Sequence, residues 1–273
     1  MPIGCIAGFV VPASIIGEGD VADIEAGKSK FVKYLIIQSC VVTLSTVPFA
    51  MLARNKPPTP PSISQSVHQE PENLKAEMGK LLRNGNYLLL CVAFTCLNSI
   101  CTCMGAVVSS VTAPYDYTAV DNAIIGGIFI ISGVIGTVII SVLLDRHHKF
   151  KLSLIGIAML ATVSLIAAQY ALPSKSVTAF SINTVFIGLS SIPAAPIGNA
   201  LAVEITYPVP ESMSNGMMNV PNIMYGFAMG ILSGYLCEVK SPPWVLALFT
   251  INCLIGLGAT LLIKEDLRRL RPK

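Results

Sequence analysis

The sequence predicts an all-α membrane protein, a helical bundle with about eight transmembrane helices. Of its 273 residues, 53% are hydrophobic and only 12% are charged, whereas soluble domains carry about 25% charged residues. The mean hydropathy of +0.69 is high. So few charges cannot cover a globule in water, and the lipid bilayer is therefore the first predicted partner. A net charge of only +3 argues against nucleic acid as a partner.

Seven apolar stretches are long enough to cross a bilayer, which requires roughly 20 residues in a helix. Lipid offers no partners for the backbone, so continuous runs of this length are expected to be helices rather than strands of a barrel. An eighth stretch, Ile3–Ile16, is short. We interpret it as a helix whose start is missing, because it lacks the basic segment of a signal peptide. The seven predicted spans are Phe31–Leu52, Tyr87–Val108, Ala123–Leu144, Leu152–Leu172, Val177–Val203, Met217–Leu236 and Trp244–Ile263.

The basic residues predict how these helices are oriented. If Met1 is cytoplasmic and every segment crosses, 13 of the 18 Lys and Arg residues lie in cytoplasmic pieces of the chain. These pieces are 54–86, 145–151, 204–216 and the tail from Lys264. The positive-inside rule favours this arrangement, which places the C-terminus in the cytoplasm. Both the plasma membrane and an intracellular membrane fit the pattern.

A polar segment divides the predicted helices into two and six. Residues 55–72 are rich in Pro and Ser and are typical of a linker. Residues 73–82 carry three apolar residues at helical spacing, which fits either a short helix along the membrane surface or an extension of the next span. We therefore expect a two-helix remnant of an N-terminal lobe at 1–53, a cytoplasmic linker at 54–86, a six-helix C-terminal lobe at 87–263 and a tail at 264–273.

The turn between the second and third helices of the six reads LDRHHKFK, over Leu144–Lys151. An Asp followed by basic residues here resembles the signature loop of the major facilitator superfamily. Asp145, followed by Arg146, is expected to bind helix N-termini or an Arg on a neighbouring helix, as a latch on the cytoplasmic side. The alternative is an ordinary basic loop. The adjacent histidines have no third ligand, so no metal site is predicted.

A second turn reads EITYPVPE and is followed by SMSNGMMN. It closely resembles the turn E-L-T-Y-P-E-S-E-G, continuing to G-L-L-N, of the FLVCR family (feline leukaemia virus subgroup C receptor-related transporters). The segment LLRNGNYLLL, the LDR loop and the tail EDLRR are also similar to that family. With Asp145 and Arg146, we interpret four residues of the second turn as gating or motif residues: Glu204, Tyr207, Pro208 and Glu211.

The resemblance implies a twelve-helix facilitator that carries a small organic solute, either a choline- or ethanolamine-like amine or haem. It also implies that four helices precede the first one here, so the chain would be N-terminally truncated. The family's choline site surrounds the ammonium with aromatic faces. Cys103 stands where that site has a Tyr, and Ile223 stands where it has a Gln. The alternative is a transport-incompetent, truncated or regulatory membrane protein or receptor.

Polar residues at mid-depth are candidates for contact with such a substrate, or else for hydrogen bonds that join helices. The predicted spans after the linker contain no Asp, Glu, Lys or Arg in their interiors, which gives no support to proton coupling. No acid pair, His cluster or Ser–His arrangement indicates an enzyme. Apart from the substrate, we predict no cofactor and no protein partner. The substrate-binding candidates are Asn98, Thr102, Cys103, Asn219, Asn222 and Tyr225.

Overall fold

The computed structural model describes residues 24–52 and 74–264, together with the isolated positions 4, 8, 11, 12 and 15. Within these ranges the regular structure is helical, and seven segments are long and apolar enough to cross a membrane. The predicted all-α membrane fold is therefore confirmed. The short stretch Ile3–Ile16, most of the linker and the tail beyond Lys264 lie largely outside the described residues. The helices are α3 (Ile24–Leu52), α5 (Leu74–Arg83), α6 (Gly85–Thr112), α7 (Ala119–His147), α8 (Phe150–Ala171), α9 (Val177–Ser191), α10 (Ala194–Thr206), α11 (Glu211–Val239) and α12 (Pro242–Leu262).

Helix α3 belongs to one compact unit of the chain, and α5 to α12 belong to another. Taken by itself, α3 is an apolar helix whose large side chains, such as Phe49, are exposed. Its hydroxyl groups are nevertheless satisfied: Thr43 and Thr46 each donate to a backbone carbonyl one turn earlier, at 2.8 Å. This is how hydroxyl side chains are accommodated where no water is available.

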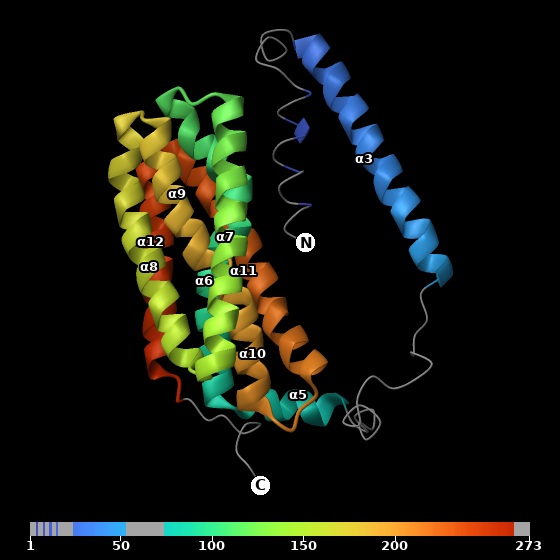
Figure 1. The fold of residues 1–273 in the computed structure, drawn as a ribbon, viewed down its shortest axis with the longest axis vertical. Coiled ribbons are helices and arrows are strands. Elements are labelled where there is room, and N and C mark those ends of the chain that lie inside the picture. The colour runs from blue at the N-terminus through green and yellow to red at the C-terminus, as the bar shows by residue number, and fades with distance from the viewer. Residues whose placement is uncertain are drawn as a thin grey trace. The chain divides into compact units, whose positions relative to one another are not determined.

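In the second unit the helices form two groups of three, and the first helix of each group packs mainly against helices of the other group (Figure 1). The first group is α6, α7 and α8, and the second is the α9–α10 segment, α11 and α12. Helix α6 packs mainly against α11 and α12, while α9 packs mainly against α7 and α8. The third helices of the two groups, α8 and α12, also pack together. The first helix of each group therefore lies between the second and third helices of the other, as inverted repeats require.

The predicted span Val177–Val203 crosses as one segment but is not one continuous helix. Helix α9 ends at Ser191 and α10 begins at Ala194. Pro193 stands between them, and proline has no N–H to continue the backbone ladder and clashes with the preceding turn. The break is therefore encoded by Pro193, within a stretch that its hydropathy predicts as one continuous span.

Close packing of α7 against α9 depends on glycine. A Cβ added to Gly136 would lie 2.7 Å from the carbonyl oxygen of Leu189, which is backbone and cannot move aside. A Cβ added to Gly127, on the same helix, would meet nothing within 4 Å. Close packing of α7 therefore requires glycine at position 136 but not at position 127.

We expect Gly136→Ala to lower the stability of the bundle by about 1–3 kcal/mol, because the new methyl group forces α7 and α9 apart. Gly127→Ala is the matched control and should be neutral or slightly stabilising, since alanine favours a helix over glycine. Thermal unfolding of both variants in detergent would measure the difference. Equal melting temperatures would mean that this contact does not hold the two helices together.

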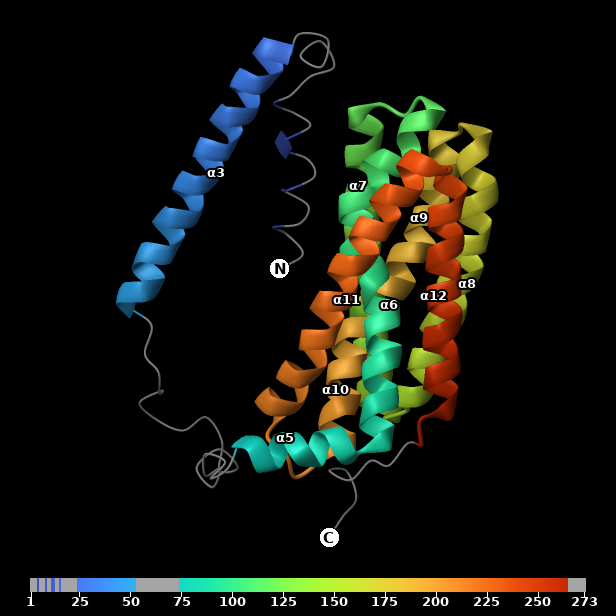
Figure 2. The same cartoon turned by 180° about the vertical axis from the view of Figure 1, so that it is seen from behind.

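One end of the bundle collects basic residues, and we call it the basic end: α5, the α7–α8 turn, the α10–α11 turn and the end of α12 (Figure 2). Helix α5 lies crosswise to the long helices there. Asn84 is extended between α5 and α6, and its side chain accepts from the N–H of Tyr87, so α5 is a separate helix. The alternative of an extension of the next span is wrong. The position of α5 along a membrane surface stays a prediction.

The end of α12 is closed by a lysine from α8. Lys151 Nζ donates to the carbonyl oxygens of Leu261 and Ile263, at 2.8 and 2.7 Å. These carbonyls have no partner within their own helix, and a cation is favoured beside the negative end of the helix dipole. Part of the positive charge at this end therefore has a structural role, besides any role in orientation.

Candidate functional site

A polar layer joins α6 to α11 at mid-depth. Asn98 Nδ2 donates to Asn222 Oδ1 at 3.3 Å, and the thiol of Cys103, five residues further along α6, lies 3.4 Å from the carbonyl oxygen of Gly226. On α11 the two partners are four residues apart and therefore lie on one face of that helix. The structure therefore brings together the predicted residues Asn98, Asn222 and Cys103, and also Gly226, which is next to the predicted Tyr225. We call this set, with Tyr225, Ser99 and Asn252 described next, the polar layer.

Asn252 of α12 is the centre of the layer, and sequence reasoning missed it. Its Nδ2 donates to the carbonyl oxygen of Cys96 at 2.8 Å and to Ser99 Oγ at 2.7 Å, and its Oδ1 accepts from the Tyr225 hydroxyl at 2.8 Å. One amide thus connects α6, α11 and α12 while being only 2% exposed. A lone Asn within an apolar 21-residue helix was the signal that could have found it.

The predicted candidates differ in how accessible they are. Thr102 is exposed, and Asn98 and Tyr225 are half-buried, so these three border the open side of the layer. Asn222 and Cys103 are 4% and 1% exposed and lie behind them. The arrangement thus combines buried residues that join the helices with exposed residues that a solute could reach.

Asn219 is not connected to the layer, since its Nδ2 donates to the carbonyl oxygen of Asn215 within α11 itself. Its inclusion among the candidates is not supported by any interhelical contact in the described part of the chain. Ile223, at the position where the resembling family has a Gln, is 68% exposed and apolar.

The layer consists of neutral hydrogen-bonding groups. Amides and hydroxyls can accept from a polar solute and can surround a cation with oxygen dipoles, and the Tyr225 ring adds an aromatic face. Neutral groups remain uncharged over the physiological pH range, so this layer itself does not exchange protons. Such a surface is suited to binding and releasing a solute without covalent chemistry.

We expect Tyr225→Phe and Asn252→Ala to be coupled energetically, since they remove two partners of one hydrogen bond. Polar contacts between membrane helices have average coupling energies of about 0.6 kcal/mol, with a maximum of about 1.7 kcal/mol. Asn252→Ala should cost more than Tyr225→Phe, because it removes three hydrogen bonds instead of one. A double-mutant cycle on unfolding in mixed micelles would measure the coupling, and strictly additive losses would contradict the bond.

The Tyr–Pro turn at the basic end is held by hydrogen bonds from two helices. Thr206 Oγ1 bonds to Ser214 Oγ at 3.1 Å, and the Tyr87 hydroxyl donates to the carbonyl oxygen of Ser214 at 2.7 Å. The peptide bond between Tyr207 and Pro208 is cis. The start of α11 is therefore fixed to both α10 and α6.

The four predicted gating residues of this turn are placed differently. Tyr207, Pro208 and Glu211 lie on the turn or at the start of α11, where Tyr207 and Glu211 are exposed. Glu204 is 7% exposed, and its Oε2 has no hydrogen-bond partner among the described residues. A buried carboxylate oxygen without a partner is costly, so Glu204 is the member of this set with unmet hydrogen-bonding capacity.

Asp145 and Arg146 lie in the last turn of α7, which ends at His148 with a positive φ of 51°. Both side chains are exposed, and across residues 74–264 neither forms a hydrogen bond or ion pair. The proposed latch therefore stays a prediction. No group of three His, Cys, Asp or Glu side chains gathers into a metal site in the part of the chain that the structure describes.

At the opposite end, which we call the far end, two turns are built alike. A short 3-10 helix follows α6 and another follows α8, and each ends on a residue with positive φ, Asp116 and Lys175. These two side chains form an ion pair at 2.6 Å. Next to it, Tyr117 packs edge-on against Phe180 with a centroid distance of 6.0 Å. Burial, and then the Asp121 carboxylate, raise the pKa of Tyr117, so its hydroxyl stays protonated at neutral pH.

The exchange of partners between two three-helix groups, around a polar layer at mid-depth, is the arrangement of one lobe of the facilitator fold. The sequence model described as Major Facilitator Superfamily matches residues 1–208. The chain belongs to that superfamily, and its relatives place it on the FLVCR-like branch. It is 25% identical to the choline/ethanolamine transporter FLVCR2 of Homo sapiens, over 98% of this chain and 51% of that protein.

Two further relatives extend the comparison. The choline/ethanolamine transporter flvcr2b of Danio rerio is 24% identical, over 98% of this chain and 56% of its own length. An uncharacterized MFS-type transporter of Caenorhabditis elegans is 25% identical, over 98% of this chain and 46% of its own length. The resemblance predicted from the Tyr–Pro turn is thus confirmed. The chain spans about half the length of the curated relatives it matches.

Proposed function

We propose that this protein takes part in the transport of a small organic solute by alternating access, and that the polar layer is its side of the substrate site. The observation that carries the proposal is the bond from Asn98 to Asn222, which places neutral polar groups of two helices at mid-depth. Sites of this kind lie near the bilayer midplane in facilitators, at the interface between repeats. An enzymatic role has no support from the layer, which contains no acid, base or nucleophile pair.

For the substrate, we propose an amine-bearing solute of the choline or ethanolamine class. The relatives named above are described as choline/ethanolamine transporters. Tyr225 offers an aromatic face, and Asn98 and Thr102 offer oxygen acceptors, which suit an ammonium or hydroxyl group. Because Cys103 and Ile223 replace the family's Tyr and Gln, the contacts to the solute would differ from those of the family. Haem as a substrate rests on the resemblance alone.

The two turns at the basic end are proposed to control access to the layer. Rocking of the lobes changes which charged groups meet at one end of a facilitator. Exposed Asp145 and Arg146 on one turn, and Glu211 on the other, supply charges for such contacts, and buried Glu204 has a free acceptor. With the basic end in the cytoplasm, as the positive-inside rule favours, these residues would act on the cytoplasmic side. The C-terminus would then also be cytoplasmic.

We expect Asn222→Ala to reduce uptake of radiolabelled choline or ethanolamine roughly tenfold, because it removes the partner that holds the accessible Asn98 side chain in place. Gln169→Leu is the matched control. It removes another interhelical amide bond, from Gln169 Nε2 to Thr250 Oγ1 at 3.2 Å, which lies on α8 and α12 outside the layer. Uptake per molecule at the membrane would be compared in cells. Equal effects of both substitutions would place the substrate elsewhere.

The same assay should be run on the chain alone and on the chain joined to the N-terminal lobe of human FLVCR2. A site shared between lobes predicts uptake by the joined protein and little or none by the chain alone. If neither transports while both reach the membrane, the transport proposal fails. A receptor or regulatory function would then be the better account.

A further inference from the structure

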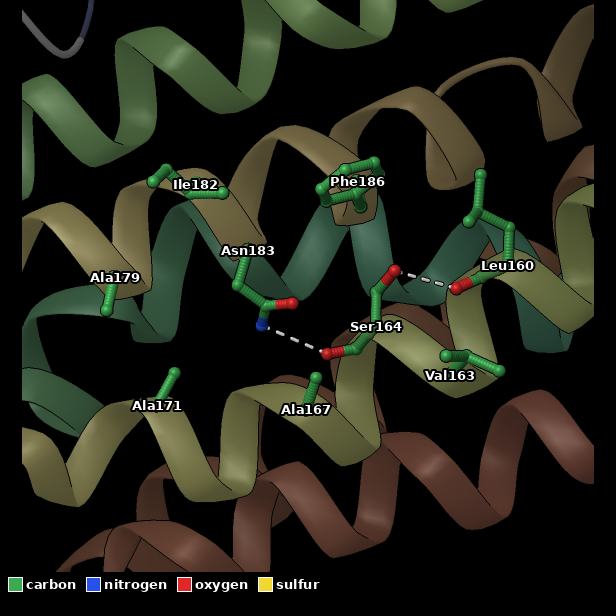
Figure 3. A pocket seen from close by; sticks show the side chains of 9 residues that line it. All are labelled: Leu160, Val163, Ser164, Ala167, Ala171, Ala179, Ile182, Asn183 and Phe186. Atoms are coloured by element: carbon green, nitrogen blue, oxygen red, sulfur yellow. Dashed lines mark hydrogen bonds between the residues drawn. The ribbon is translucent and has the colours of Figure 1, made fainter.

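A groove separates α8 from α9 near the far end of the bundle, away from the polar layer (Figure 3). Its volume is about 450 Å³, within the range of small-molecule sites. Alanines at 167, 171 and 179 create the hollow, since larger side chains there would fill it. Val163 and Ile182 form its walls and are 64% and 57% exposed. The lining residues are Leu160, Val163, Ser164, Ala167, Ala171, Ala179, Ile182, Asn183 and Phe186.

Two buried polar side chains, Ser164 and Asn183, line this groove, and Asn183 is the one with an amide oxygen that accepts no hydrogen bond in the described part of the chain. Asn183 is 9% exposed, and its Nδ2 donates to the backbone carbonyl oxygen of Ser164 at 3.0 Å. A carbonyl only accepts, so the amide nitrogen faces it and the amide oxygen, which lies in the space between α8 and α9, is left to accept from another donor (Figure 3). The Ser164 hydroxyl cannot serve this oxygen, since it donates to the carbonyl of Leu160 at 2.7 Å. Within residues 74–264 Asn183 Oδ1 has no donor, which is unfavourable in a membrane.

The polar groups around the mouth of the groove are already engaged. Lys175 is paired with Asp116, Ser174 donates to the carbonyl of Ala171, and Ser176 accepts from the N–H of Ala179. A phospholipid headgroup needs cations or free donors for its phosphate. The groove instead offers one hydrogen-bond acceptor beneath an apolar wall, which fits a lipid with a single hydroxyl donor.

The depth of Asn183 fits the same kind of lipid. It lies six residues after Val177, which is about 9 Å along a helix. The headgroup region of a bilayer is roughly 5–8 Å deep on each side. The amide oxygen therefore lies near the boundary between headgroups and hydrocarbon, where a lipid whose only polar group is a hydroxyl places that group. Towards mid-depth the groove continues along Phe186 and Leu160, which are apolar.

We propose that this groove binds a membrane sterol, whose hydroxyl donates to Asn183 Oδ1 and whose ring system lies over Ala167 and Ala171. A rigid ring system loses little conformational freedom on binding, whereas a lipid with two flexible chains loses more. A flat ring also suits a wall of alanines, from which nothing larger than a methyl group projects. The sterol supplies the donor that Asn183 lacks and covers the exposed Ile182 and Phe186.

The test is photolabelling of the full chain in membranes with a photoreactive sterol, followed by peptide mapping. We expect labelling of α8 and α9 that excess cholesterol displaces and that its 3α-hydroxyl epimer displaces at least about threefold less well, because the epimer misplaces the donor. Ala167→Phe, which fills the groove, should abolish the labelling. Ile166→Phe adds the same ring to α8 outside the groove and should leave it unchanged.

Asn183→Leu should reduce labelling roughly three- to tenfold, with melting temperature measured in parallel to detect any loss of packing. The proposal is overturned if Ala167→Phe labels like the unmodified chain or if the two epimers compete equally. It is also overturned if photoreactive ceramide or diacylglycerol labels the same peptides in preference to the sterol, because the occupant would then be another hydroxyl lipid. None of these readouts depends on solute uptake.

Discussion

The whole bundle depends on one constraint: inside a membrane, a polar group must find its partner within the protein. Asn252 shows how this is met, because one amide satisfies groups on α6 and α11 and is itself almost fully used. Hydroxyls along the helices follow the same rule by bonding to carbonyls one turn back, as Thr162 and Thr250 do. Polar residues in such a bundle therefore either join helices or are available to a ligand. A polar atom without a partner in the protein indicates the second role.

The polar layer and the residues Asn183 and Glu204 illustrate this distinction. The polar layer is well connected on its buried side and borders exposed Thr102 on the other, which is what a site that binds weakly and releases requires. Asn183 and Glu204 are the opposite case, each keeping an acceptor without a donor in the described part of the chain. Glu204 lies by the Tyr–Pro turn, and Asn183 lies in a groove near the far end. Unmet groups also occur within the spans, since Thr95 Oγ1 and Asn199 Oδ1 are buried and have no hydrogen-bond partner among the described residues.

Much of this could be predicted from the sequence, and the parts that could not have physical causes. Span positions follow from length and hydropathy, which depend on the bilayer and not on neighbouring helices, so all seven described spans were predicted. The break at Pro193 was missed because hydropathy continues across it. Asn98 and Asn222 were found because each stands at mid-depth. Asn252 was missed, and the bond of Asn219 within its own helix was not foreseen, because one sequence does not show which face of a helix meets which neighbour.

The exchange of partners between the two groups of three helices has a consequence for biosynthesis. The hydrogen bond from Asn252 Nδ2 to Ser99 Oγ joins residues that are 153 positions apart, so it can form only after α12 has been synthesised. At a synthesis rate of about 5–20 residues per second, α6 spends roughly 8–30 s in the membrane before that partner is made. During this interval its polar side chains face lipid, or whatever assists insertion. The contacts that complete the candidate site are therefore also among the last that the ribosome makes possible, so a chain interrupted before α12 would keep the Asn98–Asn222 bond but lose every contact of Asn252.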